Sequence, residues 1–414
     1  MAPFLFDRLL PAAAGDTIDA MRLIAILFLL TVPVFPQAMD KAKLAGIAPR
    51  MKEFVDAGKA AGIVTLVAHK GEVVELDAVG YTDVETRQPM TKENIFQLHS
   101  MTKPVVALAA MQLAEEGRLS LADPVEKHLP EFRGQMVTAA AYPDGSKLMK
   151  NPARPITIRD LMTHTSGMML NPPAGIGELH GALHKSLADV ALVLSQQALE
   201  FEPGTKWQYS NTGIAALARI VEVIGGQPLE VFMAKRIFEP LGMKDTYFFP
   251  PKDKWHRMPT AYISRAGKLV KYTSDPLGEG AMKFRDGAKY SLPEGGLYST
   301  AADLLVLYKT ILNGGRHGTF RLLSPAGLGL MRQSHTGELR TGTPGAGWGL
   351  GWFVMKEESA GQPMAAGTFG HGGRYGTFCF LDPKNDLIGI FLIHREGGSE
   401  ERQAFVQLAY AALP

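Results

Sequence analysis

The sequence has 414 residues, of which 46% are hydrophobic, and a formal net charge of +2 at pH 7. A chain of this size can bury a large core, in one large domain or in two to three smaller ones. The small net charge and the lack of a long basic block argue against a nucleic-acid-binding protein. The single cysteine, Cys379, excludes an intrachain disulfide framework and a cysteine-rich zinc site.

The first 38 residues are expected to form a leader. Met21 and Arg22 make a short basic start, the run 23–34 is almost wholly apolar, and Ala38 offers a small residue for cleavage. This is the pattern of a signal peptide, and the apolar run is short for a spanning helix. We therefore expect translation to start at Met21 and the protein to be periplasmic or secreted, without stable membrane insertion. An uncleaved leader that anchors the protein is the alternative, and N-terminal sequencing of the exported protein distinguishes the two.

Strand patterns occur near both ends of the folded chain, and helical patterns fill the middle. A helical pattern over 39–57 precedes two β-branched runs at 62–68 and 73–79, which are joined by a hairpin. Further helices are predicted from Ser100 to Gly117, over 156–162 and 187–199, after Asn211, and between Thr300 and Asn313. Segments 136–154 and 250–293 read as irregular, whereas 347–352 opens a strand region, 377–381 and 387–394 read as strands, and 400–413 as a terminal helix.

This order predicts one antiparallel sheet built from both ends of the chain, with the first and last helices packed on it. The helical middle forms a second lobe. The expected fold class is α/β in the broad sense (α+β). A single domain spans 39–414, with an α/β lobe of 39–94 and 340–414 and a helical lobe of 95–339.

Ser100 lies at or just before the start of the helix that ends near Gly117. Lys103 follows one turn later on the same face, within reach of the serine hydroxyl, and no other serine in the chain has a lysine three residues on. A serine beside a lysine at a helix start is an arrangement for nucleophilic catalysis. The alternative is a helix-capping serine followed by a solvated lysine.

A second motif, Tyr209-x-Asn211, occurs once in the chain. In an extended or turn segment, residues two apart can point the same way. The Tyr209 phenol could then shuttle a proton, while the Asn211 amide fixes the lysine or a substrate carbonyl. The alternative is a buried tyrosine whose hydroxyl is capped locally by the amide.

Several other enzyme signatures are missing from the chain. No serine lies in Gly-x-Ser-x-Gly, and no phosphate-binding or dinucleotide-binding glycine loop is present. His180 and His184 are four apart, but Gly181 stands where a zinc protease carries glutamate. His164 is expected to be structural, hydrogen-bonded within its turn. We therefore expect neither a metal nor a cofactor.

The order Ser100-x-x-Lys103, Tyr209-x-Asn211 and then a glycine-rich strand resembles the serine β-lactamase and penicillin-binding superfamily. It is most similar to class C β-lactamases and, nearer still, to family VIII carboxylesterases. Three further stretches resemble segments that recur across this group, and the resemblance covers roughly residues 45 to 410. They are Thr163-His164-Thr165-Ser166-Gly167, Glu202-Pro203-Gly204 and Gly296-Leu297-Tyr298-Ser299.

The third motif departs from the lactamase pattern of Lys-Thr-Gly, which the chain lacks. Three substitutes compete, at 335–337, 340–342 and 371–373. We choose His371-Gly372-Gly373, because it lies on a predicted strand that is followed by a hairpin and the terminal helix, where the family's motif belongs.

The resemblance implies acyl transfer through an acyl-enzyme on Ser100, with Lys103 and Tyr209 as a coupled base pair. The expected oxyanion hole is the backbone N–H of Ser100 and that of Arg374. Residues expected to contact or organise the substrate are Asn211, His371, Gly372, Gly373 and Trp348. His371 could equally be a strand residue without a catalytic role, and packing in the core is the alternative for one of Trp348 and Trp352.

Three functions follow from these motifs. The first is an exported serine esterase acting on small-molecule carboxylic esters. The second is a β-lactamase or a D-amino-acid peptidase or transacylase, which the missing third-motif lysine disfavours because that cation helps to hold the substrate carboxylate. The third is a non-catalytic relative that binds peptidoglycan or a partner protein, which has no need of Ser100, Lys103 and Tyr209 together.

Overall fold

In the computed structural model, the described residues are 38–172, 184–272, 288–357, 363–396 and 399–414. The expected leader and its start at Met21 lie outside these residues except for Ala38, and His180 lies outside them as well. The description below concerns residues 39–413, which cluster as one unit.

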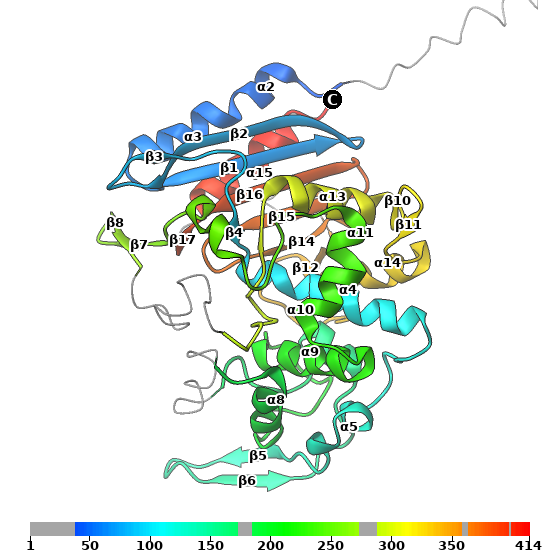
Figure 1. Ribbon diagram of the computed structural model, residues 1–414. Helices are drawn as coiled ribbons and strands as arrows, with labels where there is room; N and C mark the ends of the chain where they lie inside the picture. Colours follow the sequence, from blue (N-terminus) through cyan, green and yellow to red (C-terminus); the bar gives the residue numbers. More distant parts are fainter. Residues whose placement is uncertain (1–37, 173–183, 273–287, 358–362, 397–398) are drawn as a thin grey trace, which may run out of the picture. The chain divides into compact units, whose positions relative to one another are not determined.

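An eight-stranded antiparallel sheet combines strands from both ends of the chain (Figure 1), in the order β12-β13-β14-β15-β16-β1-β2-β3. Strand β1, from the N-terminal part of the chain, pairs with β16, from the C-terminal part, in a register that places Ile63 opposite Ile393. The sheet confirms the expected fold class. Its strands are β1 (Gly62–His69), β2 (Glu72–Asp83), β3 (Gln88–Pro89), β12 (Ala346–Trp348), β13 (Phe353–Met355), β14 (Phe369–Gly372), β15 (Phe378–Asp382) and β16 (Leu387–Ile393).

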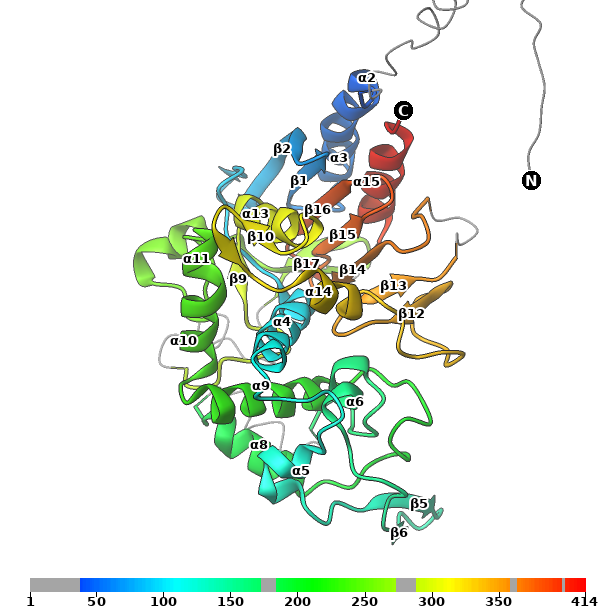
Figure 2. The ribbon, with the colours of Figure 1, turned by 90° about the vertical axis from the view of Figure 1, so that its right-hand side faces the viewer.

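Helices cover both faces of the sheet. Successive side chains of a strand point to opposite faces, and the apolar side chains of β1 are buried on both of them. Ile63 and Val67 of β1 join the core beneath α2 (Lys41–Ala45), α3 (Ile47–Asp56) and α15 (Glu400–Ala411). Val64 and Leu66 join the larger core on the other face. Figure 2 shows α3 and α15 on one side of the sheet and α13 (Ala301–Leu312) on the other.

The helical pattern over 39–57 is two helices that meet at Gly46, rather than one. Asp40 caps the first helix by accepting a hydrogen bond from the backbone N–H of Ala42 at 2.9 Å. Pro49 lies in the first turn of α3, where the missing N–H has no partner within the helix to lose.

The helix α4 (Thr102–Glu115) runs between the sheet and the helices of the middle segment, and twelve of its residues are buried. Such a helix is apolar on every side because it is packed on every side. It contacts α9 (Asn211–Gly225) closely, whereas α13, which we grouped with the helical lobe, packs on β16 and β1. The remaining helical segments are α5 (Val125–His128), α6 (Ile158–Thr163), α8 (Leu187–Ser195), α10 (Leu229–Met233), α11 (Glu239–Leu241), α14 (Pro325–Met331), η1 (His99–Met101), η2 (Pro130–Phe132), η3 (Ala234–Phe238) and η4 (Lys252–Arg257).

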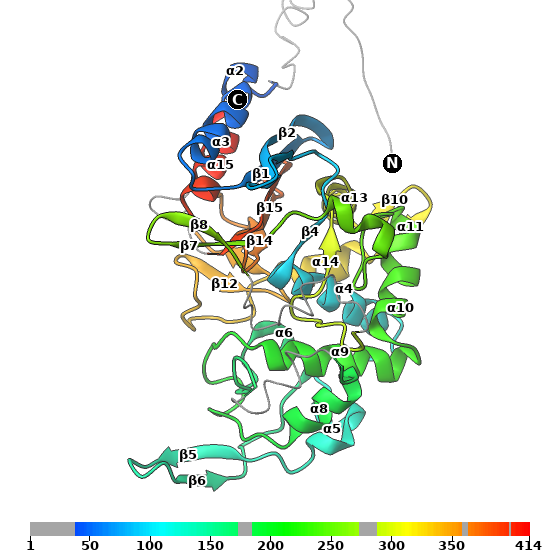
Figure 3. The ribbon, with the colours of Figure 1, turned by 60° about the vertical axis from the view of Figure 1, so that its left-hand side comes forward.

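Two segments expected to be irregular contain hairpins, so that part of the prediction was wrong. Segment 136–154 holds β5 (Val137–Ala141) and β6 (Lys147–Lys150), which lie at the end of the helical part away from the sheet (Figure 3). Segment 250–293 holds β7 (Tyr262–Arg265) and β8 (Lys268–Lys271), with β17 (Arg395–Glu396) beside β7. Much of these hairpins is exposed, so backbone pairing forms them without the apolar alternation that reveals a half-buried strand.

Short pairings complete the fold, namely β4 (Phe96–Gln97) with β9 (Tyr298–Ser299) and β10 (Arg316–His317) with β11 (Phe320–Arg321). No helix within the described ranges has both the length and the apolar character needed to cross a membrane.

Candidate active site

Ser100 lies in a one-turn 3-10 helix, η1, between the short strand β4 and α4. The preceding residue, His99, has a left-handed backbone with φ of +47°, which is uncommon for a residue with a side chain and is found at functional turns. The Leu98 N–H donates to the Leu297 carbonyl at 2.8 Å. No side-chain cap is present at the start of α4, which is against the capping alternative for Ser100.

Lys103 lies in the first turn of α4 and its side chain is fully buried. Its Nζ donates to the Ser100 hydroxyl oxygen at 2.9 Å and to the Glu294 carbonyl at 2.6 Å. Burial lowers the pKa of Lys103 to about 7, against the opposing charge of Glu294. A solvated lysine is therefore excluded, and a large share of the lysine is the neutral amine near pH 7.

Tyr209 lies in the segment that leads into α9, and its side chain is placed between Lys103 and His371. Its ring centroid lies 4.8 Å from the Lys103 Nζ, and its hydroxyl lies 3.4 Å from the His371 Nε2. Burial raises the pKa of the Tyr209 phenol, and a hydrogen bond with the Ser100 side chain only partly offsets this. The phenol is thus protonated near neutral pH, while the lysine is poised to lose its proton.

His371 belongs to β14 and presents a neutral imidazole to Tyr209. Burial, followed by the charge of Lys103, lowers the pKa of His371 to about 3. Its Nδ1 lies 2.7 Å from the Gly372 carbonyl oxygen, which can only accept a hydrogen bond. Nδ1 therefore carries the proton and Nε2 accepts from the Tyr209 hydroxyl. Among the three substitutes for the third motif, 371–373 is the one with this contact, whereas His335 bonds the Leu330 carbonyl.

Gly373 brings the end of β14 against the turn that carries Ser100. A Cβ at this position would lie 2.4 Å from the Leu98 carbonyl oxygen and 2.0 Å from the Thr377 hydroxyl oxygen, so only glycine fits. Arg374 follows directly, and its guanidinium pairs with Glu396 at 2.8 Å. The structure thus brings the backbone around Arg374 close to the Ser100 turn, while the Arg374 side chain is held by Glu396.

Trp348 lies beside Tyr209 and His371, and Asn211 begins α9 two residues after Tyr209. The Asn211 amide donates to Asn171 at 2.7 Å, and its buried Oδ1 has no partner among the described residues. The Trp348 ring lies 5.9 Å from that of Tyr209 and 5.6 Å from that of His371, and it lines a cavity beside them. Trp352 instead packs in the core against Phe369, so core packing applies to that tryptophan.

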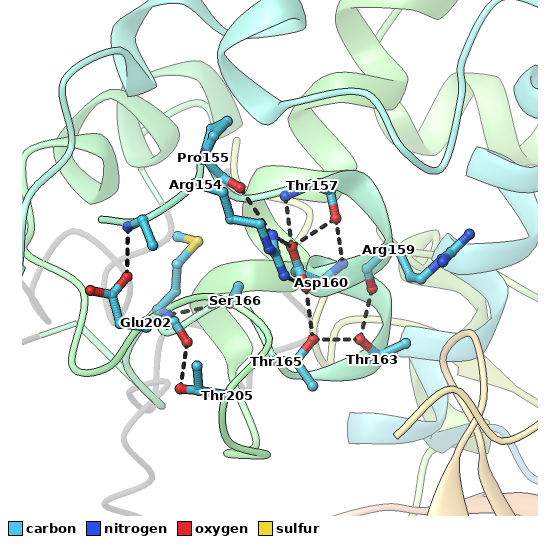
Figure 4. Close-up of polar contacts among 12 residues, drawn as sticks. Arg154, Pro155, Thr157, Arg159, Asp160, Thr163, Thr165, Ser166, Glu202 and Thr205 are labelled. Atoms are coloured by element: carbon cyan, nitrogen blue, oxygen red, sulfur yellow. Dashed lines mark hydrogen bonds and ion pairs between the residues drawn. The ribbon is translucent and has the colours of Figure 1, made fainter. Parts of the chain in front are cut away.

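A polar network holds the turn that supports Tyr209 (Figure 4). The Asp160 carboxylate receives two hydrogen bonds from Arg154, at 2.6 and 2.9 Å, and others from Thr157 and Thr165. Thr157 and Asp160 form the capping box that starts α6. The network therefore fixes both ends of the helix that delivers His164.

His164 ends α6 in a left-handed conformation and accepts hydrogen bonds from the two residues that flank Tyr209. Its carbonyl accepts from Gln208 N–H at 2.9 Å, and its Nδ1 accepts from Ser210 N–H at 3.2 Å. The His164 and Tyr209 rings are 4.3 Å apart. Burial lowers the pKa of His164 well below its usual value, so it is neutral. These contacts fit the expected structural role of His164.

Glu294 is a site residue that the sequence analysis missed. Its carbonyl holds Lys103, and its buried carboxylate accepts from the Tyr290 hydroxyl at 3.1 Å. It lies 191 positions from Lys103, in a stretch without periodicity, and reaches the site only because segment 297–299 runs beside 96–98. No sequence signal would have found it.

Comparison with known proteins gives a consistent family. The Beta-lactamase family model matches residues 47–412. Esterase EstB of Burkholderia gladioli is 32% identical over 80% of this chain and 85% of its own. Lovastatin esterase of Penicillium rubens is 30% identical over 81% of this chain and 89% of its own. The solved structure of EstCE1, a hydrolase with promiscuous acyltransferase activity, superposes with a TM-score of 0.77 at 29% identity, covering 89% of this chain and 99% of that one. The chain therefore belongs to the Beta-lactamase family, in the superfamily that serine β-lactamases and penicillin-binding proteins share with family VIII carboxylesterases.

Proposed function

We propose that the protein is a serine esterase that hydrolyses small carboxylic esters through an acyl-enzyme on Ser100. The observation that carries the proposal is the buried Lys103 amine, 2.9 Å from the Ser100 hydroxyl oxygen and with a pKa lowered to about 7. A general base is most effective when its pKa lies near the working pH. Esterase relatives and the absence of a third-motif lysine favour esters over substrates that need that cation.

In the proposed acylation, neutral Lys103 takes the proton of Ser100 as Oγ attacks the ester carbonyl carbon. The backbone N–H groups of Ser100 and Arg374 stabilise the resulting oxyanion. Protonated Tyr209 gives its proton to the leaving alkoxide and regains one from the Lys103 ammonium. Before this transfer the Tyr209 hydroxyl donates to the His371 Nε2, 3.4 Å away, which fixes the position of the phenol oxygen. The phenol proton turns from His371 to the leaving alkoxide when it is transferred.

In the proposed deacylation, water attacks the acyl-enzyme carbonyl and the same base takes its proton. The bond between the acyl carbon and Ser100 Oγ breaks, and the base returns to the serine oxygen the proton that it took from water. One ester and one water thus give one acid and one alcohol, and the protein is unchanged. In both half-reactions the protons move only among Ser100, Lys103, Tyr209, water and the leaving group, so the net charge of the buried site is the same before and after each one.

Active-site labelling and turnover together test the proposal. The wild-type protein should hydrolyse p-nitrophenyl butyrate, turn over nitrocefin far more slowly, and gain one fluorophosphonate adduct by mass. Ser100→Ala should lose both the adduct and turnover, whereas Ser146→Ala, in the exposed β5–β6 hairpin, should keep both. Nitrocefin turnover above ester turnover would favour a β-lactamase. No turnover and no adduct in the wild type would favour a binding protein.

A further inference from the structure

The proposed reaction creates a positive charge on Lys103 inside the protein. When the amine takes the Ser100 proton it becomes an ammonium, and the Lys103 side chain has no exposed surface. A buried charge is costly unless hydrogen bonds or an opposite charge compensate it. The groups around the amine therefore determine how readily Lys103 accepts the proton.

The direct contacts of the amine are neutral. Its Nζ donates to the Ser100 hydroxyl oxygen at 2.9 Å and to the Glu294 carbonyl oxygen at 2.6 Å. The face of the Tyr209 ring, whose centroid lies 4.8 Å from Nζ, adds a weaker cation–π attraction. These contacts orient the amine, but none of them supplies the negative charge that an ammonium requires.

The titratable groups facing Lys103 come from several separate elements. His164 ends α6 and His371 belongs to β14. Burial, and then the charge of Lys103, lowers the pKa of both imidazoles, so both are neutral. Burial raises the pKa of the Tyr209 phenol, which is neutral as well. Among the described residues, Glu294 is the neighbour whose charge raises the pKa of Lys103 against the effect of burial.

The Glu294 carboxylate is fixed in place beside the amine. It is buried, and it accepts a hydrogen bond from the fully buried Tyr290 hydroxyl at 3.1 Å. The backbone around it forms a tight turn, in which Leu292 has φ of +52° and its carbonyl accepts from the Gly295 N–H at 2.9 Å. The Gln97 side chain of β4 donates to the Gly295 carbonyl at 3.3 Å. The turn is thus joined to the strand that precedes Ser100.

We propose that Glu294 is a positioning residue with two separate actions on Lys103. Its backbone carbonyl directs the amine toward Ser100, and its carboxylate is the counter-charge that stabilises the ammonium formed when Ser100 is deprotonated. The inference rests on the proposed esterase function of this site. Charges interact more strongly in a buried site than in water, so one carboxylate here has a large effect on the base.

Glu294→Gln tests the counter-charge directly. Glutamine has the same shape, and its amide oxygen can still accept the Tyr290 hydrogen bond, but it is neutral. Without the carboxylate, Lys103 loses its proton at a lower pH. The acid limb of kcat/KM for p-nitrophenyl butyrate should therefore move down by about one pH unit or more. The plateau should fall about three- to tenfold, because a base of lower pKa is weaker.

Nuclear magnetic resonance of ¹³C-labelled lysine follows the same proton without turnover. The Lys103 Cε resonance is identified as the one missing from Lys103→Met. Its titration midpoint should lie near pH 7 in the wild type, in line with the lowered pKa of about 7, and about one pH unit or more lower in Glu294→Gln.

Three further variants complete the design. Glu294→Ser is also neutral, leaves room for water beside Tyr290 and should lower the midpoint like Glu294→Gln, so the test stands if one of the two fails to fold. Glu294→Asp keeps the charge and should lower the midpoint less than either. Glu53→Gln, at an exposed position on α3, is the matched control, and its midpoint should change by less than about 0.2 pH units because exposed charges are screened.

The outcomes separate this inference from the esterase proposal. Ester turnover that falls in Glu294→Gln while the acid limb and the lysine midpoint stay in place would overturn the counter-charge and leave the esterase proposal standing. No ester turnover in the wild type, together with a lowered midpoint in Glu294→Gln, would overturn the esterase proposal and support the pairing of the two charges.

Discussion

Replacing Lys103 with methionine should abolish turnover and at the same time remove a pH dependence of folding stability. Methionine has a similar length and no charge, so it tests the cost of burying the amine. The folded pKa of Lys103 is lowered from 10.5 to about 7 by burial. Between these values the unfolded chain binds more protons than the folded one, so the stability of the wild type rises with pH across this window.

The stability cost of burying the Lys103 amine follows from the change in its pKa on folding. The drop from 10.5 to about 7 corresponds to roughly 4 kcal/mol of lost stability near pH 7.5, at about 1.4 kcal/mol per pKa unit. Methionine relieves this cost but leaves the Glu294 carbonyl without its donor, which costs about 1–3 kcal/mol. We expect a net gain of about 1–3 kcal/mol in the variant near pH 7.5, shrinking as the pH rises.

Urea unfolding at several pH values measures this directly. Between about pH 7.5 and 8.5 the wild type should gain about 1 kcal/mol relative to Lys103→Met. Lys52→Met, at an exposed position on α3, is the control and should follow the wild type. A stability difference between Lys103→Met and the wild type that does not change over this range would refute the buried, neutral lysine and with it the proposed base.

Two further predictions concern the groups around the lysine. Tyr209→Phe should lower kcat on p-nitrophenyl butyrate by about 10²–10⁴-fold, because the leaving alkoxide loses its proton donor. Near-wild-type kcat would remove the phenol from the mechanism, and Tyr142→Phe, at an exposed position directly after β5, is the control. Asp160→Asn should lower the free energy of unfolding by about 2 kcal/mol, because a buried carboxylate that accepts five hydrogen bonds is replaced while the partly exposed Arg154 can still be solvated. Chemical denaturation measures the second effect, and an unchanged midpoint would show that the network does not hold the α6 turn.

The sequence by itself determined the fold class and singled out the proposed nucleophile with its neighbouring lysine. Hydrophobic period, glycine stops and strand runs are local properties of the chain, and they placed the sheet at its two ends. The spacing between Ser100 and Lys103 is also local, because one helical turn fixes the distance between their side chains. Tyr209-x-Asn211 and His371-Gly372-Gly373 depended on a resemblance, since nothing local ties either motif to Ser100.

Only the tertiary structure decided the electrostatics of the site. The pKa values of Lys103, Tyr209 and His371 depend on burial, which is contributed by residues distant in the chain. The contact of Glu294 with Lys103 likewise arises from the packing of separate elements. Pairing of exposed hairpins at 137–150 and 262–271 also escaped prediction, because backbone hydrogen bonds form there without a buried face to leave a pattern in the sequence.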